Sequence, residues 1–179
     1  MKPIELKHLV FIDESGAQTN MARRRGRCDK SQRLRVRQPH GHWKTTTMIS
    51  AIRIDGPCAP FVVEGAVDAE VFRAYVGKVL VPDLRAGDVV VMDNLQPHKA
   101  SGVREMIEAA GASVLYLPPY SPDFNPIEMA ISKVKSLLRK LAARSVDLLI
   151  DAIGTALLAV SPEDVLHYIA HCGYGATNG

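Results

Sequence analysis

Apolar and polar residues follow two different periods along the chain. Five apolar runs, rich in β-branched residues, predict strands at residues 5–15, 42–56, 59–67, 87–94 and 113–118. The Asp-Gly-Pro sequence at 55–57 predicts a tight antiparallel turn between the second and third strands. Apolar residues at helical spacing predict five helices, at residues 68–82, 99–110, 126–143, 145–159 and 161–171.

The order of these elements indicates the fold class. A strand, a helix and a strand follow one another between residues 87 and 118, which implies parallel pairing through a right-handed crossover. We therefore predict an α/β fold with a mixed five-stranded sheet flanked by helices: three strands form a meander and two arrive through crossovers. A chain of 179 residues is long enough for one well-buried core. We expect one domain at residues 1–174 and a flexible tail at 175–179.

Composition excludes several classes of protein. Apolar residues make up 47% of the chain and charged residues 23%, as in ordinary soluble domains, and no stretch is apolar enough to span a membrane. The first residues do not have the pattern of a signal peptide. The three cysteines are far apart and form no CxxC pair, which is typical of reduced intracellular thiols. We expect a cytoplasmic protein.

The net charge of +3 is unevenly divided. Residues 16–44, a predicted basic loop, carry +8, whereas the rest of the chain carries −5. A basic stripe on an acidic body indicates a polyanionic partner, although a solvated loop has the same composition. The basic residues of this loop are Arg23, Arg24, Arg25, Arg27, Lys30, Arg33, Arg35, Arg37 and Lys44.

Two apolar runs are followed by an aspartate: Asp13 in "VFIDES" and Asp93 in "VVVMDN". If both strands are parallel neighbours, the two side chains lie at the same edge of the sheet, where open α/β sheets bind ligands. Neighbouring carboxylates repel each other unless a cation lies between them, and Mg²⁺ or Mn²⁺ prefers such oxygen ligands. Each aspartate taken alone is also consistent with a turn.

A third acid, Glu128, lies just inside the helix predicted at 126–143. Pro122 and Pro126 restrict the preceding loop, and Asp123 and Asn125 can form turn or cap hydrogen bonds there. Such a loop can hold one side chain in place at low entropic cost. Three carboxylates can bind two divalent ions roughly 3.5–4 Å apart, which contact both the attacking and the leaving oxygens of a phosphodiester.

Three segments resemble the catalytic motifs of DDE transposases of the mariner superfamily, most closely the bacterial insertion-sequence six-thirty branch. These segments are "FIDES", "VVVMDNLQPHKA" and "LPPYSPDFNPIEMAISKVK". The 34 residues between Asp93 and Glu128 are similar to the family's spacing, and residues 39–56 resemble the segment that follows the first aspartate. The resemblance extends from about residue 8 to residue 174.

The resemblance implies a ribonuclease-H-like fold in which Asp13, Asp93 and Glu128 are the catalytic, metal-binding residues. It implies two Mg²⁺ or Mn²⁺ ions, cleavage of double-stranded DNA at transposon ends, and transfer of the freed strand into target DNA. Three further residues would orient the metal ligands or contact DNA: Asn94, His98 and Asn125. Lys133 and Lys135 would join the basic loop in DNA binding, although the exposed face of a helix is often basic for solubility alone.

Members of this family carry an N-terminal helix-turn-helix region, and this sequence reaches its first catalytic strand within about a dozen residues. We therefore expect the catalytic domain only. A separately encoded helix-turn-helix partner, homodimerisation on DNA and association with a bacterial nucleoid are expectations from the resemblance. Three alternatives remain: a repair or recombination nuclease of the same fold, a non-catalytic DNA-binding regulator, and a structural or interaction module, which leaves the three carboxylates unexplained.

Overall fold

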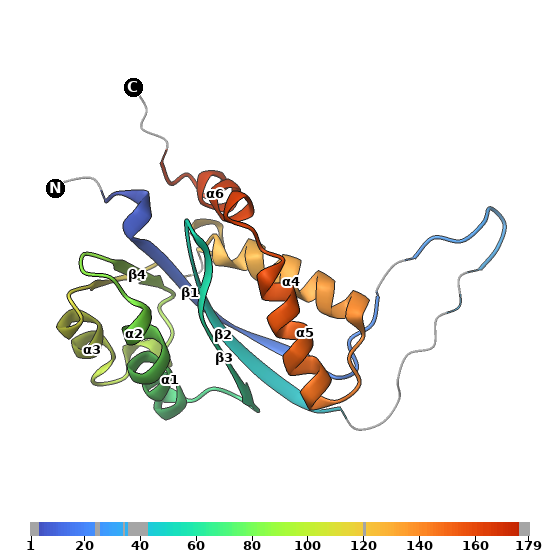
Figure 1. Ribbon diagram of the computed structural model, residues 1–179, viewed down its shortest axis with the longest axis horizontal. Coiled ribbons are helices and arrows are strands. Elements are labelled where there is room, and N and C mark those ends of the chain that lie inside the picture. The colour runs from blue at the N-terminus through green and yellow to red at the C-terminus, as the bar shows by residue number, and fades with distance from the viewer. Residues whose placement is uncertain (1–3, 24–25, 34, 36–42, 120, 176–179) are drawn as a thin grey trace.

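Figure 1 shows the computed structural model, which describes residues 4–23, 26–33, 35, 43–119 and 121–175. The described residues form one five-stranded sheet in the order β3-β2-β1-β4-β5. β1–β2 and β2–β3 pair antiparallel, whereas β1–β4 and β4–β5 pair parallel. The predicted mixed sheet, with its meander and crossovers, is confirmed. The strands are β1 (Leu9–Gln18), β2 (Thr45–Arg53), β3 (Gly56–Glu64), β4 (Val89–Met92) and β5 (Ser113–Tyr116).

Helices cover both faces of the sheet (Figure 1). One face carries α1 (Ala69–Tyr75), which continues through a π-helical turn (Val76–Leu80) into α2 (Val81–Asp83), together with α3 (Val103–Ala109). The other face carries α4 (Ile127–Leu141), α5 (Val146–Leu158) and α6 (Pro162–His171). Short 3-10 turns lie at Leu6–His8, Pro97–Lys99 and Pro122–Phe124.

Side-chain alternation along β1 divides the core into two halves. Leu9 and Phe11 pack with the α4–α6 layer, whereas Val10 and Ile12 pack with the α1–α3 layer. All four side chains are buried. Successive residues of a strand point to opposite faces, so a central strand between two helical layers must be apolar on both faces. Asp13 continues the face of Phe11 and therefore lies on the α4 side.

Local signals account for several helix boundaries. The Asp68 side chain accepts hydrogen bonds from the backbone amides of Glu70 and Val71 and so caps α1, as the sequence predicts. Ser161 and Asp164 form a reciprocal capping box at the start of α6. Gly111, with φ of 79°, follows the end of α3, where a left-handed residue favours glycine.

The first strand differs from the prediction. It begins at Leu9 and continues to Gln18, so Asp13 lies within the strand and not at its end. The pairing explains the difference: β1 leaves β4 after Phe11, but it continues beside β2 as far as the Gln18–Thr45 pair. Asp13 therefore lies where β1 loses one of its two neighbours. In the described part of the chain, no helix has the length and hydropathy needed to cross a membrane. Of the predicted tail, only Gly175 is described.

Candidate active site

The strand register brings two of the three predicted carboxylates together. Leu9 pairs with Val89 and Phe11 with Val91, and continuing this register places Asp13 beside Asp93. Both aspartates continue the strand face that is covered by α4, whose first turn contains Glu128. The three carboxylates line one cavity of about 380 Å³. Its other lining residues are Asn94, Leu95, Leu117, Pro118, Pro119, Ser121 and Asn125.

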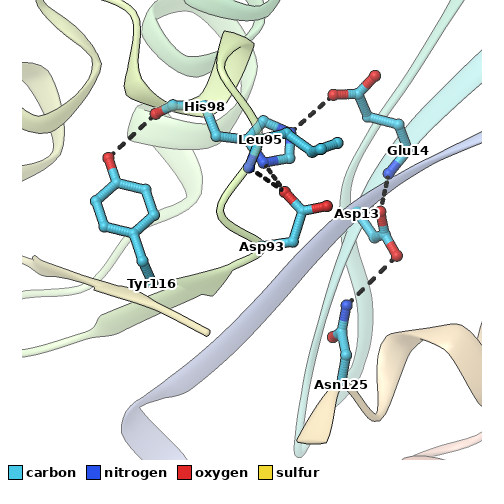
Figure 2. Close-up of polar contacts among 7 residues, drawn as sticks. All are labelled: Asp13, Glu14, Asp93, Leu95, His98, Tyr116 and Asn125. Atoms are coloured by element: carbon cyan, nitrogen blue, oxygen red, sulfur yellow. Dashed lines mark hydrogen bonds and ion pairs between the residues drawn. The ribbon is translucent and has the colours of Figure 1, made fainter. Parts of the chain in front are cut away.

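The proline-containing segment after β5 positions Glu128. The Leu117 amide donates to the Met92 carbonyl at 2.8 Å, which extends the β4–β5 pairing up to the first proline. The Glu128 amide donates to the Asn125 carbonyl at 3.1 Å, and buried Ile127 anchors the start of α4 in the core. Asn125 is itself buried and donates from Nδ2 to Oδ2 of Asp13 through a long contact of 3.4 Å (Figure 2). The loop therefore touches the first aspartate directly.

Asp13 has an environment that disfavours its negative charge. Burial raises its pKa most strongly, and the negative charges of Asp93 and Glu128 raise it further, to about 6. The Glu14 amide, which donates to Oδ1 at 2.7 Å, opposes this increase only in part. A bound cation would reverse the balance because opposite charge stabilises the ionised form.

His98, which is 1% exposed, connects the first and second motifs (Figure 2). Its Nε2 lies 2.8 Å from Oε1 of Glu14, and its Nδ1 lies 2.5 Å from Oδ1 of Asp93. The ring packs against Phe72, with the ring centroids 4.4 Å apart. The Tyr116 hydroxyl donates to the His98 carbonyl at 3.1 Å. These contacts fix the imidazole between the two carboxylates.

The positive charge of His98 and the negative charges of Asp93 and Glu14 stabilise one another. Burial acts to lower the pKa of His98, but the contacts and charges of Asp93 and Glu14 outweigh it and raise the pKa to about 9. Burial acts to raise the pKa of Asp93, and His98 outweighs that effect, so the pKa lies below its usual value. Oδ1 of Asp93 also accepts a hydrogen bond from the Leu95 amide at 3.1 Å. Within the described residues Oδ2 accepts none, so this oxygen is available to a ligand.

The donor set fits a hard divalent cation better than a soft one, because its oxygens come from carboxylates and an amide. None of the cavity's lining residues is a lysine or arginine that could neutralise the three acids. As the side chains stand, no three acidic, histidine or cysteine residues of the described chain form a group that could hold an ion. Glu128 is exposed, so its carboxylate can turn toward the aspartates without disturbing the core.

A second groove, of about 360 Å³, adjoins the cavity, and Asp13 and Glu128 line both. Lys135 and Arg139 of α4 lie along this groove, together with Glu14, Ser15, Ile131 and Ser132. Lys133 does not line it, and its Nζ pairs with Oδ2 of Asp164 at 2.5 Å. Of the two lysines predicted to bind DNA, the structure thus brings Lys135 next to the carboxylates and ties Lys133 to α6.

Hydrogen bonds hold the start of the basic loop in place. Nη1 of Arg144, which lies between α4 and α5, donates to the carbonyls of Thr19 and Met21 at 3.1 and 2.8 Å. The predicted DNA-binding residues that are described in the loop are exposed: Arg23, Arg27, Lys30, Arg33 and Arg35. Three further predicted residues lie outside the described residues: Arg24, Arg25 and Arg37.

Sequence reasoning missed two residues at the site. Glu14 directly follows Asp13, yet only the fold shows that it pairs with His98. Arg139 lies eleven residues after Glu128, which is three helical turns and therefore the same side of α4, so helical periodicity could have identified it.

The sheet order and the two helical layers match the ribonuclease-H-like fold of solved transposase structures. The sequence family described as DDE superfamily endonuclease matches residues 8–150, and the chain belongs to this family. No curated protein sequence matches the chain.

Solved structures of Mos1 transposase share the fold. The Mos1 strand transfer complex is 19% identical, with a TM-score of 0.71 over 93% of this chain and 52% of that chain. The Mos1 paired-end complex with the left transposon end is 18% identical, with a TM-score of 0.73 over 93% and 52%. The mariner Mos1 paired-end complex with Mn is 18% identical, with a TM-score of 0.70 over 94% and 53%. The chain spans about half the length of these transposases, and at such identities the likeness shows the fold alone.

Proposed function

We propose that this chain is the catalytic domain of a transposase that cuts DNA at transposon ends and joins the cut strand to target DNA. The observation that carries the proposal is the shared cavity of Asp13, Asp93 and Glu128 in a DDE-family fold. The three quoted motifs and the 34-residue spacing support assignment to the bacterial insertion-sequence six-thirty branch.

Asp13, Asp93 and Glu128 would hold two divalent ions, Mg²⁺ or Mn²⁺. When bound, such ions lower the pKa of a coordinated water and stabilise the charge that develops on a phosphodiester. One Mos1 paired-end complex was solved with Mn and another with Mg, which supports the same choice for this chain.

The protein's own part in the reaction is to hold its carboxylates in place. His98 fixes one oxygen of Asp93 and leaves the other available, while Asn125 and the Glu14 amide hold Asp13. Such neighbours set the orientation of metal ligands. Glu128, in the first turn of a helix entered through prolines, completes the set from α4. Asn94 lines the same cavity and would contact the substrate or a ligand there.

DNA would pass over the carboxylates and along the adjoining groove. Lys135 and Arg139 follow Glu128 on one side of α4, where they can neutralise successive phosphates of one strand. The exposed arginines and lysines of the basic loop would add contacts to the duplex. Phosphate contacts carry no base specificity, so we propose that a helix-turn-helix partner recognises the transposon ends.

We also propose that residues 1–174 form this catalytic domain, with the basic segment predicted at 16–44 as an insertion, although residues 16–18 of that segment continue β1 beside β2. Two copies would act together, one on each transposon end. The described Mos1 relatives include paired-end complexes, which supports that arrangement for this chain.

Cleavage of a labelled duplex that carries the element's terminal repeats tests the proposal, with Mg²⁺ or Mn²⁺ present or removed by chelation. We expect metal-dependent nicking by the wild-type protein and none by the Asp93→Asn or Glu128→Gln variants. Glu163→Gln is a matched control: like Glu128 it is the exposed second residue of a helix, but it lies outside the cavity.

The three interpretations predict different results. Equal cleavage of repeat and random duplexes by the wild-type protein, with no strand transfer, would favour a nuclease. Binding without cleavage, in the presence of the helix-turn-helix partner, would favour a regulator. Wild-type cleavage rates in both carboxylate variants would refute the assignment of the site.

A further inference from the structure

The chain segment that follows α6 returns to the candidate site. Tyr174 lies two residues beyond the cap of α6 at Cys172, where the sequence alone gives no reason to expect a contact with the catalytic motifs. Its hydroxyl donates to the Phe124 carbonyl at 2.8 Å. Its ring meets the ring of Phe11 edge to face, with centroids 5.0 Å apart and an interplanar angle of 67°. One side chain therefore contacts two elements that are far apart in the sequence.

The end of α6 determines where Tyr174 lies. The Tyr174 amide donates to the Ile169 carbonyl at 3.1 Å, and the Gly173 amide donates to the Ala170 carbonyl at 3.0 Å. These two bonds form a Schellman motif, with Gly173 at φ of 83° in the left-handed position. The motif reverses the chain within two residues and directs Tyr174 back toward the sheet, where it packs with the core shared by β1 and α4.

Both contacts of Tyr174 lie close in sequence to proposed metal ligands. Phe11 is two residues before Asp13 on the same face of β1. Phe124 immediately precedes Asn125, which contacts Asp13, and it lies four residues before Glu128. The Tyr174 ring therefore rests on the strand that carries the first carboxylate, while its hydroxyl holds the loop that carries the third.

We propose that Tyr174 is a positioning residue that sets the place of Glu128 relative to Asp13. Its ring fixes the distance from β1, and its hydroxyl restrains the proline-containing loop through one backbone carbonyl. The effect of Tyr174 on catalysis rests on the proposed function, whereas its restraint on the loop is independent of that function. Misplacement of a catalytic group by about 1 Å can reduce a rate by about a hundredfold, so a single loop restraint is sufficient to matter.

Tyr174→Phe separates the two contacts, because phenylalanine retains the ring and loses only the hydroxyl. Hydrogen exchange of the full chain, followed by mass spectrometry, would measure opening of residues 121–129. We expect roughly fivefold faster exchange of the Glu128 and Met129 amides in this variant, the effect of losing one hydrogen bond's net stabilisation, with little change in melting temperature. Tyr174→Ala, which also removes the ring contact with Phe11, should produce a larger effect in the same peptides.

Tyr168→Phe is the matched control. Tyr168 lies in α6, packs against the same core cluster, and its hydroxyl makes no hydrogen bond within the described chain. We expect its exchange pattern to match that of the wild-type protein. Unchanged exchange at residues 121–129 in Tyr174→Phe, or an equal increase in Tyr168→Phe, would overturn the proposed restraint.

Cleavage assays test the catalytic consequence separately. We expect Tyr174→Phe to lower kcat by about tenfold, to leave DNA affinity unchanged and to require more Mg²⁺ for half-maximal rate. If the wild-type protein shows no metal-dependent cleavage, the proposed function fails, and the exchange measurement still decides whether Tyr174 restrains the loop. If exchange accelerates and kcat and the Mg²⁺ requirement do not change, the catalytic role of Tyr174 is refuted.

Discussion

Each end of β4 carries an aspartate, and the two aspartates lie in opposite environments. Asp88 immediately precedes the strand and Asp93 immediately follows it. Asp88 is fully buried and lies 3.3 Å from Nη2 of Arg53, which is also buried, and it accepts a hydrogen bond from the Arg85 amide at 2.9 Å. Asp93 lies in an open cavity beside two more acids.

The difference separates a structural charge from a functional one. At the Asp88 end, the arginine supplies the opposite charge from within the protein, so that end needs no ligand. At the Asp93 end, one histidine faces several carboxylates, and excess negative charge remains beside a cavity. Proteins keep such an arrangement, which costs stability, mainly where a ligand neutralises it.

We expect the largest change in the free energy of unfolding when Asp88, at the structural end of β4, is replaced. Asp88→Ala leaves the buried Arg53 charge without its partner, and breaking such a pair costs about 3–5 kcal/mol. Asp93→Asn should change the free energy of unfolding by less than about 1 kcal/mol, because the side chain is partly exposed. Urea denaturation of both variants without metal measures the difference. Equal destabilisation would remove the distinction between the two ends.

Replacing Asp13, in contrast, should raise the free energy of unfolding in the absence of metal. Its pKa is raised to about 6 in the folded protein, so the folded state binds the proton more tightly, and stability falls as pH rises from about 4 through 6. Without metal, Asp13→Asn should therefore stabilise the protein above pH 6. We expect about 1–2 kcal/mol, less than the full shift implies, because the side chain is partly exposed to solvent. Urea denaturation at pH 4 and pH 7.5 checks this, and an unchanged pH dependence would count against the burial and the neighbouring negative charges that raise the pKa of Asp13.

His98 should produce a smaller, pH-dependent effect. Its pKa is raised to about 9, so its ionic contribution to stability is fully present below about pH 6.5 and is lost as pH rises through 9. The stability difference between the wild-type protein and His98→Gln should shrink by about 1 kcal/mol between pH 6 and pH 10. Unfolding measured at both pH values decides this, and a constant difference would indicate that His98 contributes packing alone.

The same contrast between a paired and an unpaired charge applies to two lysines of α4. Lys133 is paired with Asp164, whereas Lys135 has no ion pair among the described residues and lines the groove beside Glu128. Lys135→Ala should weaken duplex binding by about 1 kcal/mol and reduce the salt slope by about one. Lys133→Ala should leave the slope unchanged. Binding measured from 50 to 200 mM salt distinguishes them, and equal slopes in both variants would remove the groove from the proposed DNA path.

The sequence predicts most of the fold because the central strands are nearly continuous apolar runs and because α1, α5 and α6 begin at side-chain caps. It also identifies the cavity carboxylates, since Asp13 and Asp93 interrupt apolar runs and Glu128 follows a restricted loop. It does not identify the role of Glu14, because contact with His98 depends on the pairing of distant segments. The same limit applies to Tyr174, whose contacts with Phe11 and Phe124 span most of the chain. A local sequence pattern identifies the carboxylates of a motif, whereas only the tertiary structure identifies the residues that position them.

Calorimetric titration with Mn²⁺ tests the central claim most directly, namely that Asp13, Asp93 and Glu128 together bind a divalent ion. We predict saturable binding to the wild-type protein and to Glu163→Gln. Removal of a ligand from a small site should weaken binding by at least about tenfold in each of Asp13→Asn, Asp93→Asn and Glu128→Gln. Binding of wild-type strength in any two of these three variants, each folded, would contradict the account.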